Sequence, residues 1–347
     1  MINSFNIKIG LLQFLIILSA NALFGCGNNP DSVKISTAES YPRWLMNNDY
    51  HTSQTSGVTF LKNSADSTMQ FLLADDIGYI HRFFLKNDTV FSFSEIKFSR
   101  EVMDYLAAFP KLDFEEICYD KFSGNVYLTI EGNGEDYLSF HGIYKLNFKD
   151  NDIFQDLIIS IEKLEFNPSE IFYENLKNNI GYEGFTADEN YFYLGLENIQ
   201  TSEGNFSDHT VIRVADKKTL EIVKEISTEN LGISTICGLY SDRNYSLWGI
   251  DRNNKRIFKL KLDQYFNVQE INSFEVKTVI PRYNNLEYSG SLESITIAAD
   301  KFLFLVDDPW QAHFIPPDEI LNQIDESTKD NFKKFIPVIY KFIIDKY

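Results

Sequence analysis

Short runs of alternating apolar and polar residues recur along the chain, and each is followed after a turn by a second apolar run. Residues 180–197, IGYEGFTADENYFYLGLE, show this plan with one glutamate near each end. The same plan recurs at 114–131, 237–251 and 292–308, and more loosely at 56–76. Period-two alternation bounded by turn residues is typical of half-buried β-strands. The pattern therefore predicts a β-hairpin that is repeated along the chain.

Each predicted hairpin is followed by further strand-like runs. Third strands are expected at 79–85, 142–148, 210–215, 256–262 and 338–345. The first four copies add a fourth strand, whereas the fifth copy runs out of chain after its third. Residues 33–40, VKISTAES, resemble the fourth-strand run at 222–230, so we expect this N-terminal strand to complete the last copy. Such a closure turns a row of antiparallel sheets into a ring and removes its free edges.

These repeats predict an all-β chain that folds as a β-propeller of four-stranded blades. Five blades are expected, and six is the alternative if an insertion hides a degenerate copy. Helical insertions are expected near 100–112, 168–178 and 317–335 within a propeller domain that spans residues 51–347. A β-sandwich with similar strands is the competing fold, and the regular placement of acidic residues disfavours it.

Acidic residues open and close most of the predicted hairpins. The pairs of opening and closing residues are Glu115 with Glu131, Glu183 with Glu197, Cys237 with Asp251, and Glu293 with Asp307. In two antiparallel neighbours the start of the first strand and the end of the second lie at the same edge of the sheet. Ring closure is then expected to bring these acids, and Arg252 after Asp251, to one mouth of the central axis.

Like charges gathered at one mouth need a compensating group. Either some carboxylates hold protons because their neighbours raise their pKa values, or a hard cation lies among them. Ca²⁺ takes about 6–8 oxygen ligands, which Asp and Glu provide. The five histidines are scattered and no HExxH or paired CxxC motif occurs, which disfavours zinc. If calcium is the compensating group, its expected ligands are Glu115, Glu131, Glu183, Glu197, Glu293 and Asp307.

Three opening motifs read EGF at 183–185, EEI at 115–117 and ESI at 293–295, and two second strands end in Asp251-Arg252 and Asp307-Asp308. These motifs resemble a family of extracytoplasmic propellers called esterase-like or phytase-like, to which the SdiA-regulated proteins are similar. That family repeats an EG[IFL] opening, and EGF matches it in full. The other two lack its glycine, and Ser56 and Cys237 stand where the remaining copies would carry the acid.

The resemblance implies a calcium-assisted hydrolase that acts on a phosphoester or ester ligand at an acidic central funnel. Its catalytic residues would be Glu183, Glu293, Asp251 and Arg252. Arg252 would hold a phosphate or carboxylate oxygen. No GxSxG elbow is present, which disfavours a serine esterase. The alternatives are a non-catalytic propeller that captures a ligand or an envelope protein through 317–335 and Trp310, and a structural envelope lipoprotein.

The first residues have the layout of a targeting segment. A positive charge precedes the apolar run 9–17, which is too short to span a bilayer as a helix. Residues 23–26, LFGC, resemble the lipobox of bacterial lipoproteins. We expect a signal peptide at 1–25, and a lipidated Cys26, a tether and the closing strand within 26–50. A plain secretory signal is the alternative.

Charge and cysteine content narrow the range of partners. The formal net charge of −18 argues against nucleic acid and against an anionic membrane surface. Membrane contact is therefore expected through the lipid anchor alone, in the bacterial cell envelope, with the outer membrane as the default. Besides Cys26 the chain contains only Cys118 and Cys237, which are expected to be buried free thiols and not a disulfide framework.

Overall fold

The computed structural model describes residues 33–346 apart from 48–49, 243–244 and 311–312. Contacts divide the chain into one large compact unit, Ile35–Ile344, and a small unit made of residues 1–34 and 345–347. The expected signal peptide and Cys26 lie outside the described residues. Among the residues that are described, no helix is both long and apolar enough to cross a bilayer.

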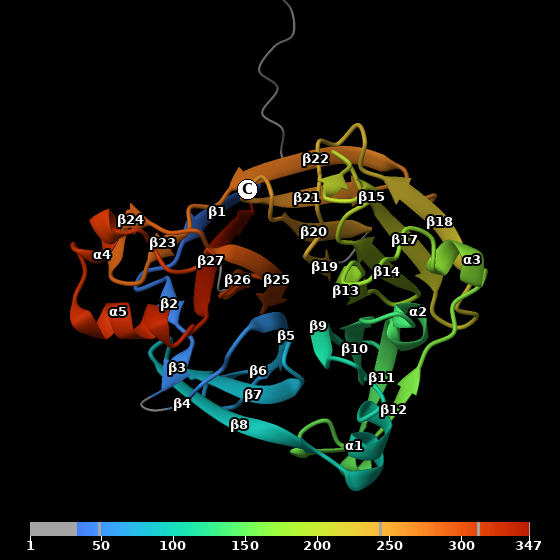
Figure 1. Ribbon diagram of the computed structural model, residues 1–347, viewed down its shortest axis with the longest axis horizontal. Coiled ribbons are helices and arrows are strands. Elements are labelled where there is room, and N and C mark those ends of the chain that lie inside the picture. The colour runs from blue at the N-terminus through green and yellow to red at the C-terminus, as the bar shows by residue number, and fades with distance from the viewer. Residues whose placement is uncertain (1–32, 48–49, 243–244, 311–312, 347) are drawn as a thin grey trace, which may run out of the picture. The chain divides into compact units, whose positions relative to one another are not determined.

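The strands form five sets of four, and Figure 1 shows the first strand of each set nearest to a common axis. The first set contains β5 (Thr55–Asn63), β6 (Met69–Asp75), β7 (Tyr79–Lys86) and β8 (Val90–Phe98). The second contains β9 (Asp113–Asp120), β10 (Asn125–Glu131), β11 (Gly142–Phe148) and β12 (Leu157–Lys163). The third contains β13 (Tyr182–Ala187), β14 (Tyr191–Leu196), β17 (Val211–Asp216) and β18 (Ile222–Ser227). The fourth contains β19 (Gly238–Asp242), β20 (Ser246–Asp251), β21 (Arg256–Leu262) and β22 (Val268–Glu275). The fifth contains β25 (Ser291–Ala298), β26 (Phe302–Asp308), β27 (Val338–Lys346) and β1 (Val33–Thr37).

Neighbouring strands within the first four sets are antiparallel and follow one another from the axis outward. The outermost strands β8 and β12 also pair with each other, in parallel, so the first two sets form one eight-stranded sheet. Sheets arranged radially around one axis define a β-propeller, which confirms the predicted fold class.

The N-terminal strand closes the ring, as the sequence predicts. Strand β1 lies at the outer edge of the fifth set next to β27, and the short strand β2 (Arg43–Trp44) pairs with β27 as well. Just beyond β1, the Ala38 N–H donates to the Lys341 carbonyl over 2.8 Å. The first and last strands of the propeller therefore lie in one sheet, and the edge of β27 is covered.

The remaining elements are short. The helices are α1 (Arg100–Leu106), α2 (Tyr137–Phe140), α3 (Ser169–Phe172), α4 (Asp318–Leu321), α5 (Glu326–Lys333) and the 3₁₀ turn η1 (Lys149–Asn151). The two-stranded hairpins are β3 (Met46–Asn47) with β4 (Tyr50–His51), β15 (Gln200–Ser202) with β16 (Asn205–Phe206), and β23 (Val279–Ile280) with β24 (Tyr283–Glu287). Each segment expected to be helical contains at least one of these helices. All of them are shorter than the expected ranges, and α2 is an additional one.

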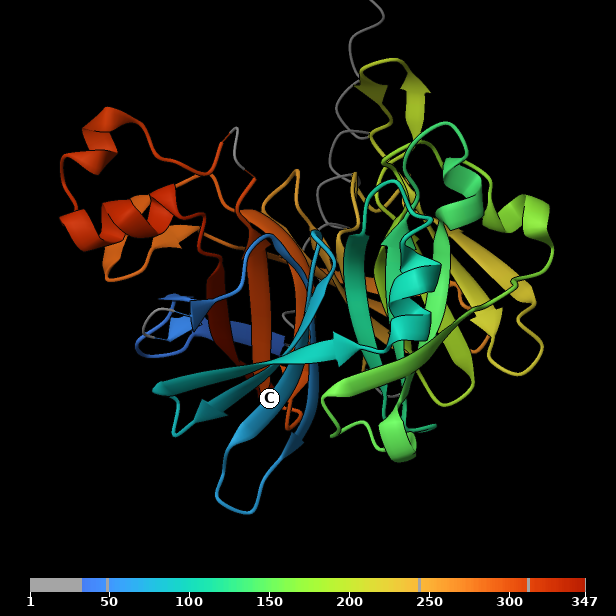
Figure 2. The same ribbon diagram turned by 60° about the horizontal axis from the view of Figure 1, so that its bottom comes forward.

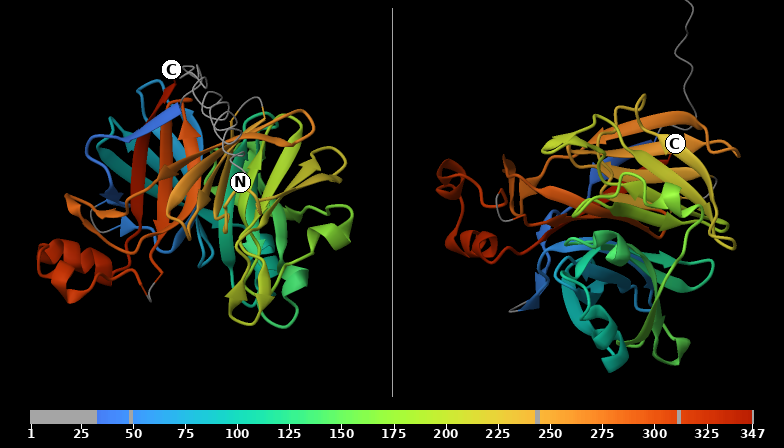
Figure 3. Two further views of the ribbon diagram at one scale, coloured as in Figure 1. Left: turned by 90° about the horizontal axis from the view of Figure 1, so that it is seen from above. Right: turned by 45° about the vertical axis from the view of Figure 1, so that its right-hand side comes forward.

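All of these insertions except η1 lie at one end of the strands. They occupy connections from a second to a third strand or from a fourth strand to the next first strand. Because the strands alternate in direction, both kinds of connection are at the end where the innermost strands begin. We call this end the mouth. Figure 2 and Figure 3 show the red helices α4 and α5 standing away from the sheets there.

The hydrophobic core lies between neighbouring sheets. Phe71 of the first set packs against Phe304 of the fifth with ring centroids 5.1 Å apart, and Tyr127 of the second packs against Phe192 of the third at the same separation. Buried aliphatic residues continue this packing between the third and fourth sets. Each sheet therefore contributes its apolar faces to its neighbours, as expected for face-to-face packed sheets.

Side-chain hydroxyl groups connect the innermost strands of adjacent sets. Thr296 Oγ1 on β25 accepts the Phe60 N–H over 3.1 Å, and Thr59 Oγ1 on β5 accepts the Tyr119 N–H over 3.0 Å. The strands approach so closely that a Cβ atom on Gly57 would lie 2.6 Å from the Glu115 carbonyl oxygen. Hydroxyl groups here satisfy backbone donors that no neighbouring strand can pair.

Candidate functional site

The register of the inner hairpins brings opening and closing residues together at the mouth. Asp113 on β9 pairs with Glu131 on β10, and Leu292 beside Glu293 pairs with Asp307. Tyr182 pairs with Leu196, which places Glu183 and Glu197 at the ends of β13 and β14. The hairpin geometry expected from the repeat therefore exists in the structure.

Acids from four of the five sets gather around the axis at this end. We call the cluster the acidic mouth, and its members are Asp76, Asp113, Glu115, Glu131, Glu183, Glu197, Glu293 and Asp308. The fourth set contributes Arg252 and Cys237 in place of an acid. Burial raises the pKa of Glu115, and the charges of Glu183 and Glu293 raise it further. Acids from three sets therefore act on one another.

Arg252 is the cation at the centre of this cluster. It follows Asp251 at the end of β20, and its side chain is 25% exposed. Its Nη2 donates to Glu197 Oε1 over 2.5 Å, and its Nη1 donates to Glu293 Oε1. The distance from Nη1 to Glu183 Oε2 is 3.8 Å, which is an ion pair without a hydrogen bond. One guanidinium therefore neutralises charge on two sets of strands at once.

Three carboxylates beside Arg252 form a group suited to a metal ion. One oxygen each from Glu131, Glu183 and Glu197 lies within 4.8 Å of the other two. Glu131 is 3% exposed and Glu183 is 9% exposed. Glu131 Oε1 and Glu183 Oε2 are buried and have no hydrogen-bond partner among the described residues. Buried polar atoms ordinarily have partners, so these two oxygens mark a place where a group can be added.

A second group overlaps the first on β9 and β10. Asp113, Glu115 and Glu131 also present oxygens within 4.8 Å of one another. Lys111 donates to Asp113 and lies 3.5 Å from Asp76, so the mouth has a second cation at its outer side. No lysine or arginine contact is found for Glu131 in the part of the chain that the structure describes.

Burial and mutual repulsion raise the pKa values of the inner acids. Burial is the main cause for Glu115, Glu131, Glu183 and Glu197, and neighbouring carboxylates add to it. Arg252 opposes the increase at Glu183 and Glu197. Burial likewise raises the pKa of Asp76 to about 6. Without a bound cation, protons on these groups relieve the repulsion.

Cys237 occupies the place of an opening acid. Its sulfur lies within 4.8 Å of carboxylate oxygens of Glu183 and Glu293. Burial raises the pKa of this thiol, and the neighbouring carboxylates act in the same direction. A protonated thiol is a poor ligand for a metal. The group that contains Cys237 is therefore less suited to a cation than the all-carboxylate groups.

Two residues of the expected set are held by local partners. Asp251 is fully buried and accepts from Arg256 Nη2 over 2.8 Å and from Asn254 Nδ2 over 2.8 Å. Asp307 is also buried and accepts from the Tyr288 hydroxyl and the Val338 N–H. Neither belongs to a carboxylate group with metal-binding spacing. Their expected roles in catalysis and in metal binding stay predictions.

Sequence reasoning missed Asp113 and Lys111. Asp113 lies two residues before Glu115, at the start of the same strand, and it faces Glu131 across the hairpin. An acid at the first position of an inner strand was the available signal. Lys111 precedes that strand in a connection, where no repeat pattern applies, and its contacts with Asp76 and Asp113 arise only in the folded ring.

No family model matches this chain, and no curated protein matches it. Solved structures do resemble it. A PQQ-bound aldose sugar dehydrogenase from Streptomyces coelicolor is 8% identical, and the match covers 90% of this chain and 99% of that one with a TM-score of 0.47. A luciferin-regenerating enzyme is 10% identical over 90% and 95% with a TM-score of 0.43. A glucose dehydrogenase is 11% identical over 79% and 96% with a TM-score of 0.41. At these identities and scores the likeness carries no argument about function.

Proposed function

We propose that this propeller binds a calcium ion at the acidic mouth through Glu131, Glu183 and Glu197, and that the mouth hydrolyses an ester or phosphoester. The observation that carries the proposal is a pair of buried oxygens that accept no hydrogen bond from the described residues, Glu131 Oε1 and Glu183 Oε2, within a group of closely spaced carboxylates. Among the described residues, Arg252 forms the ion pairs with Glu183 and Glu197, and the charge of Lys111 acts on Glu131.

The donor set fits calcium better than other metals. The ligand atoms are carboxylate oxygens, and hard cations such as Ca²⁺ prefer oxygen in flexible arrangements. The nearby thiol of Cys237 has a raised pKa, so the soft ligand that would favour zinc or copper is protonated. Asp113 lies beside Glu131 and extends the supply of oxygens.

Calcium bound here would polarise a phosphoryl or carbonyl oxygen and a water molecule. The chain's own residues have separate tasks. Arg252 holds Glu197 and Glu293 in position, and its partial exposure leaves one edge near the solvent. Glu115 is partly exposed and has a raised pKa, which suits a group that gives a proton to a leaving group or takes one from water.

The location of the protein is part of the proposal. The lipobox-like residues 23–26 and the preceding apolar run support lipidation of Cys26 and a place in the bacterial cell envelope. An anchored propeller of net charge −18 would be held at the membrane by its acyl chains and not by its surface charge. Labelling cells with an alkyne fatty acid checks this, and the variant Cys26→Ser should lose the label and leave the membrane fraction.

Calcium binding is tested on the purified propeller after chelation. We expect titration calorimetry to show a calcium site and the melting temperature to rise with calcium, because a ligand of the folded state alone stabilises it. Glu131→Gln and Glu183→Gln should each weaken binding about tenfold or more, since each removes a charged ligand. Glu326→Gln, an exposed acid on α5, is the matched control and should bind as the wild type does. Absence of calcium binding by the wild type at millimolar concentrations would refute the site.

Hydrolysis is tested with p-nitrophenyl phosphate and p-nitrophenyl acetate. Activity should require calcium and fall about 10²-fold or more in Glu115→Gln, which cannot transfer a proton. Glu326→Gln again is the control. If calcium binds but neither ester is turned over faster than by Glu115→Gln, the hydrolase part of the proposal is wrong.

A non-catalytic binding function is the second candidate, and it has its own observation. The inserted helices and hairpins surround the mouth, and Trp310, in the same connection as α4 and α5, is 59% exposed. Exposed aromatic residues on loops are typical of surfaces that bind partners. A calcium site without turnover, together with an envelope protein or a glycan that binds less well to Trp310→Ala, would favour this function.

A further inference from the structure

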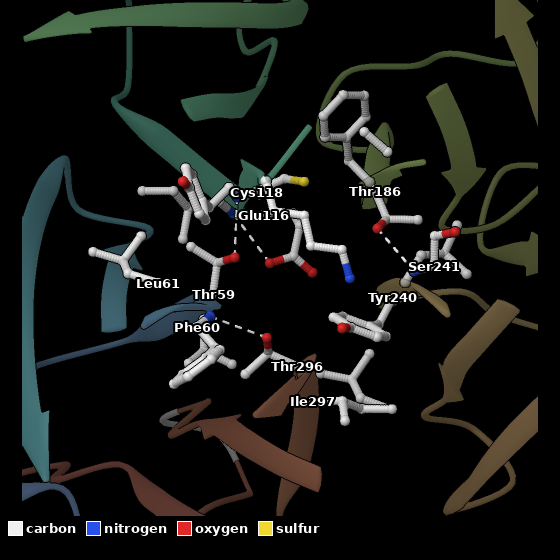
Figure 4. Close-up of a pocket in the computed structure, with 18 of the residues that line it drawn as sticks. Thr59, Phe60, Leu61, Glu116, Cys118, Thr186, Tyr240, Ser241, Thr296 and Ile297 are labelled. Atoms are coloured by element: carbon white, nitrogen blue, oxygen red, sulfur yellow. Dashed lines mark hydrogen bonds between the residues drawn. The ribbon is translucent and has the colours of Figure 1, made fainter. Parts of the chain in front are cut away.

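A cavity of about 240 Å³ lies in the part of the central channel away from the mouth. It is lined by later residues of all five innermost strands, for example Thr59, Ile117, Phe185, Leu239 and Ile295. A water molecule takes about 30 Å³, and pockets for drug-sized ligands have about 300–1,000 Å³. The cavity therefore suits a molecule of a few heavy atoms. Figure 4 shows its labelled side chains around an open centre.

Glu116 is the acid of this cavity. It is 1% exposed, and its Oε1 accepts from Ser294 Oγ over 2.6 Å and from the Ile117 N–H over 3.0 Å. Its Oε2 is buried and has no hydrogen-bond partner among the described residues. Figure 4 shows the carboxyl group of Glu116 directed into the space between Thr59, Thr296 and Tyr240. Oε1 is thus held by hydrogen bonds within the protein, and Oε2 is available to a ligand.

The repeat explains why there is room for this side chain. Glu116 is the second residue of its opening motif, and the other four copies carry Gly57, Gly184, Gly238 and Ser294 at that position. Three of the five equivalent positions therefore have no side chain. At Gly57 and Gly238 a Cβ would lie less than 3.0 Å from backbone of the next set. Glu116 is thus the one large residue at this position of the repeat, and the packing of the strands alone does not require a large acid there.

The walls suit an alkyl chain that ends in a hydrogen-bond donor. Phe185, Leu239 and Ile295 provide apolar surface. Thr59, Thr186 and Thr296 also line the cavity, and each Oγ1 accepts one backbone N–H, over 3.0, 2.9 and 3.1 Å respectively. A hydroxyl oxygen has two acceptor positions, so each of them retains one. The cavity thus combines one unpartnered carboxyl oxygen with several neutral acceptors.

We propose that this cavity is a second ligand site and that it binds a small molecule with a primary ammonium group, with Glu116 Oε2 as the principal acceptor. An ammonium group has three N–H donors and no acceptor, which matches a carboxylate flanked by hydroxyl oxygens. A divalent cation fits less well, because Glu116 and the exposed Asp300 are the only acids among the described residues that line the cavity, whereas calcium takes about 6–8 oxygens. An ionised Glu116 would repel an anion. The proposal is independent of the function proposed for the acidic mouth.

Binding should be coupled to a proton. Burial raises the pKa of Glu116, against the opposing effects of Ser294 and of the N–H groups of Ile117, Val58 and Leu239. In the free protein Glu116 therefore keeps its proton to higher pH than an exposed glutamate does, and an ammonium ligand displaces that proton. The other titratable residues that line the cavity are Cys118, Tyr119, Lys121, Tyr240 and Asp300. Of these, Lys121 and Asp300 are exposed and of opposite sign.

The probe is n-butylammonium chloride, titrated calorimetrically into the full propeller. The matched compounds are 1-butanol, which has the same shape without the charge, and butyrate, which has the opposite charge. We expect n-butylammonium to bind at least about tenfold more tightly than 1-butanol and butyrate not to bind, because only the first forms a charge-assisted hydrogen bond. The amine should also bind more tightly as pH rises, and its heat should depend on the protonation enthalpy of the buffer.

Glu116→Gln keeps the shape of the side chain and removes its charge. It should reduce amine binding to the level of 1-butanol and abolish the buffer dependence, whereas Glu326→Gln should bind the amine as the wild type does. Equal wild-type affinity for the amine and the alcohol, or unchanged amine affinity in Glu116→Gln, would overturn the proposal. Circular dichroism checks that the variant is folded. If it is not, the three-compound comparison on the wild type decides.

Discussion

The two ends of the central channel are surrounded by the same five innermost strands and have opposite characters. At the mouth, strand starts and second-strand ends carry eight acids with Arg252 and Lys111 as their cations. Farther along the channel, the innermost strands carry hydroxyl groups, apolar residues and the buried acid Glu116. The difference shows that charge collects where solvent reaches the strand ends. Deeper positions instead satisfy the backbone donors of neighbouring strands.

The acids at the two ends of the channel also differ in their charged partners and in what raises their pKa values. At the mouth, Glu183 and Glu197 share one guanidinium, and repulsion among neighbouring carboxylates contributes to the raised pKa values. Glu116 has no charged partner in the part of the chain that the structure describes, and its pKa is raised by burial, against surrounding hydrogen-bond donors. A cation bound at the mouth therefore reduces the repulsion among several carboxylates. A cation bound in the inner cavity instead provides a single carboxylate with a partner of opposite charge.

The largest effect that separates the two ends should be the pH dependence of stability. The raised pKa values of Glu115, Glu131, Glu183 and Glu197 mean that the folded protein holds protons that the unfolded chain has lost. The stability that these protons contribute is fully present below the carboxyl pKa of the unfolded chain, about 4.3. It is lost as pH rises through the higher pKa values of the folded protein. Without calcium, each such group should lower the free energy of unfolding by about 1.4 kcal/mol per pH unit in that window.

Urea denaturation over a pH series measures this slope, and calcium should flatten it because the ion replaces the protons. Glu131→Gln should reduce the slope by about the contribution of one titrating group. A slope that is the same with and without calcium would contradict the account of the mouth. Glu116 contributes in the same direction, so Glu116→Gln should also reduce the slope, but calcium should not change its part.

The next largest effect should follow from Arg252→Met. This change leaves Glu197 and Glu293 without their shared donor. Removal of one partner of a buried ion pair costs about 3–5 kcal/mol, and the partial exposure of Arg252 places the expected loss near the lower end, about 3 kcal/mol at neutral pH. Chemical denaturation measures it. The loss should shrink at acid pH, where the glutamates are protonated.

Arg100→Met is the matched control for that experiment, because Arg100 pairs with Asp104 in an exposed position on α1. The free energy of unfolding of the Arg100→Met variant should stay within about 0.5 kcal/mol of the wild-type value. Equal stability of the two arginine variants would mean that Arg252 does not hold the mouth together.

The smallest effect should come from the hydroxyl groups deeper in the channel. Thr296→Val keeps the side-chain volume and leaves the part-buried Phe60 N–H without its acceptor. This should cost about 1–2 kcal/mol. Hydrogen exchange should accelerate at Phe60 in particular, because the bond links β5 to β25. Thr201→Val, an exposed residue of the β15–β16 hairpin, serves as the control and should change neither stability nor exchange at Phe60.

A large part of the fold is predictable from the sequence for a specific reason. The repeated hairpin pattern is local, and the resemblance of residues 33–40 to a fourth strand indicates how the ring closes. The spacing of Glu183 from Glu197 places both at one edge by the geometry of antiparallel strands, and the structure has them there. The insertions are less predictable, since short helices such as α2 depend on contacts outside their own sequence.

The sequence by itself determines that strands repeat, that they form a closed ring, and that acids open and close the hairpins, because strand periodicity and hairpin register are properties of neighbouring residues. Only the tertiary structure decides which acids face one another, which are bound by Arg256 or Tyr288 instead, and that Arg252 lies among Glu183, Glu197 and Glu293. It also decides that Glu116 lies in a cavity. These contacts join residues that are far apart along the chain, and they exist only after the ring has closed around its axis.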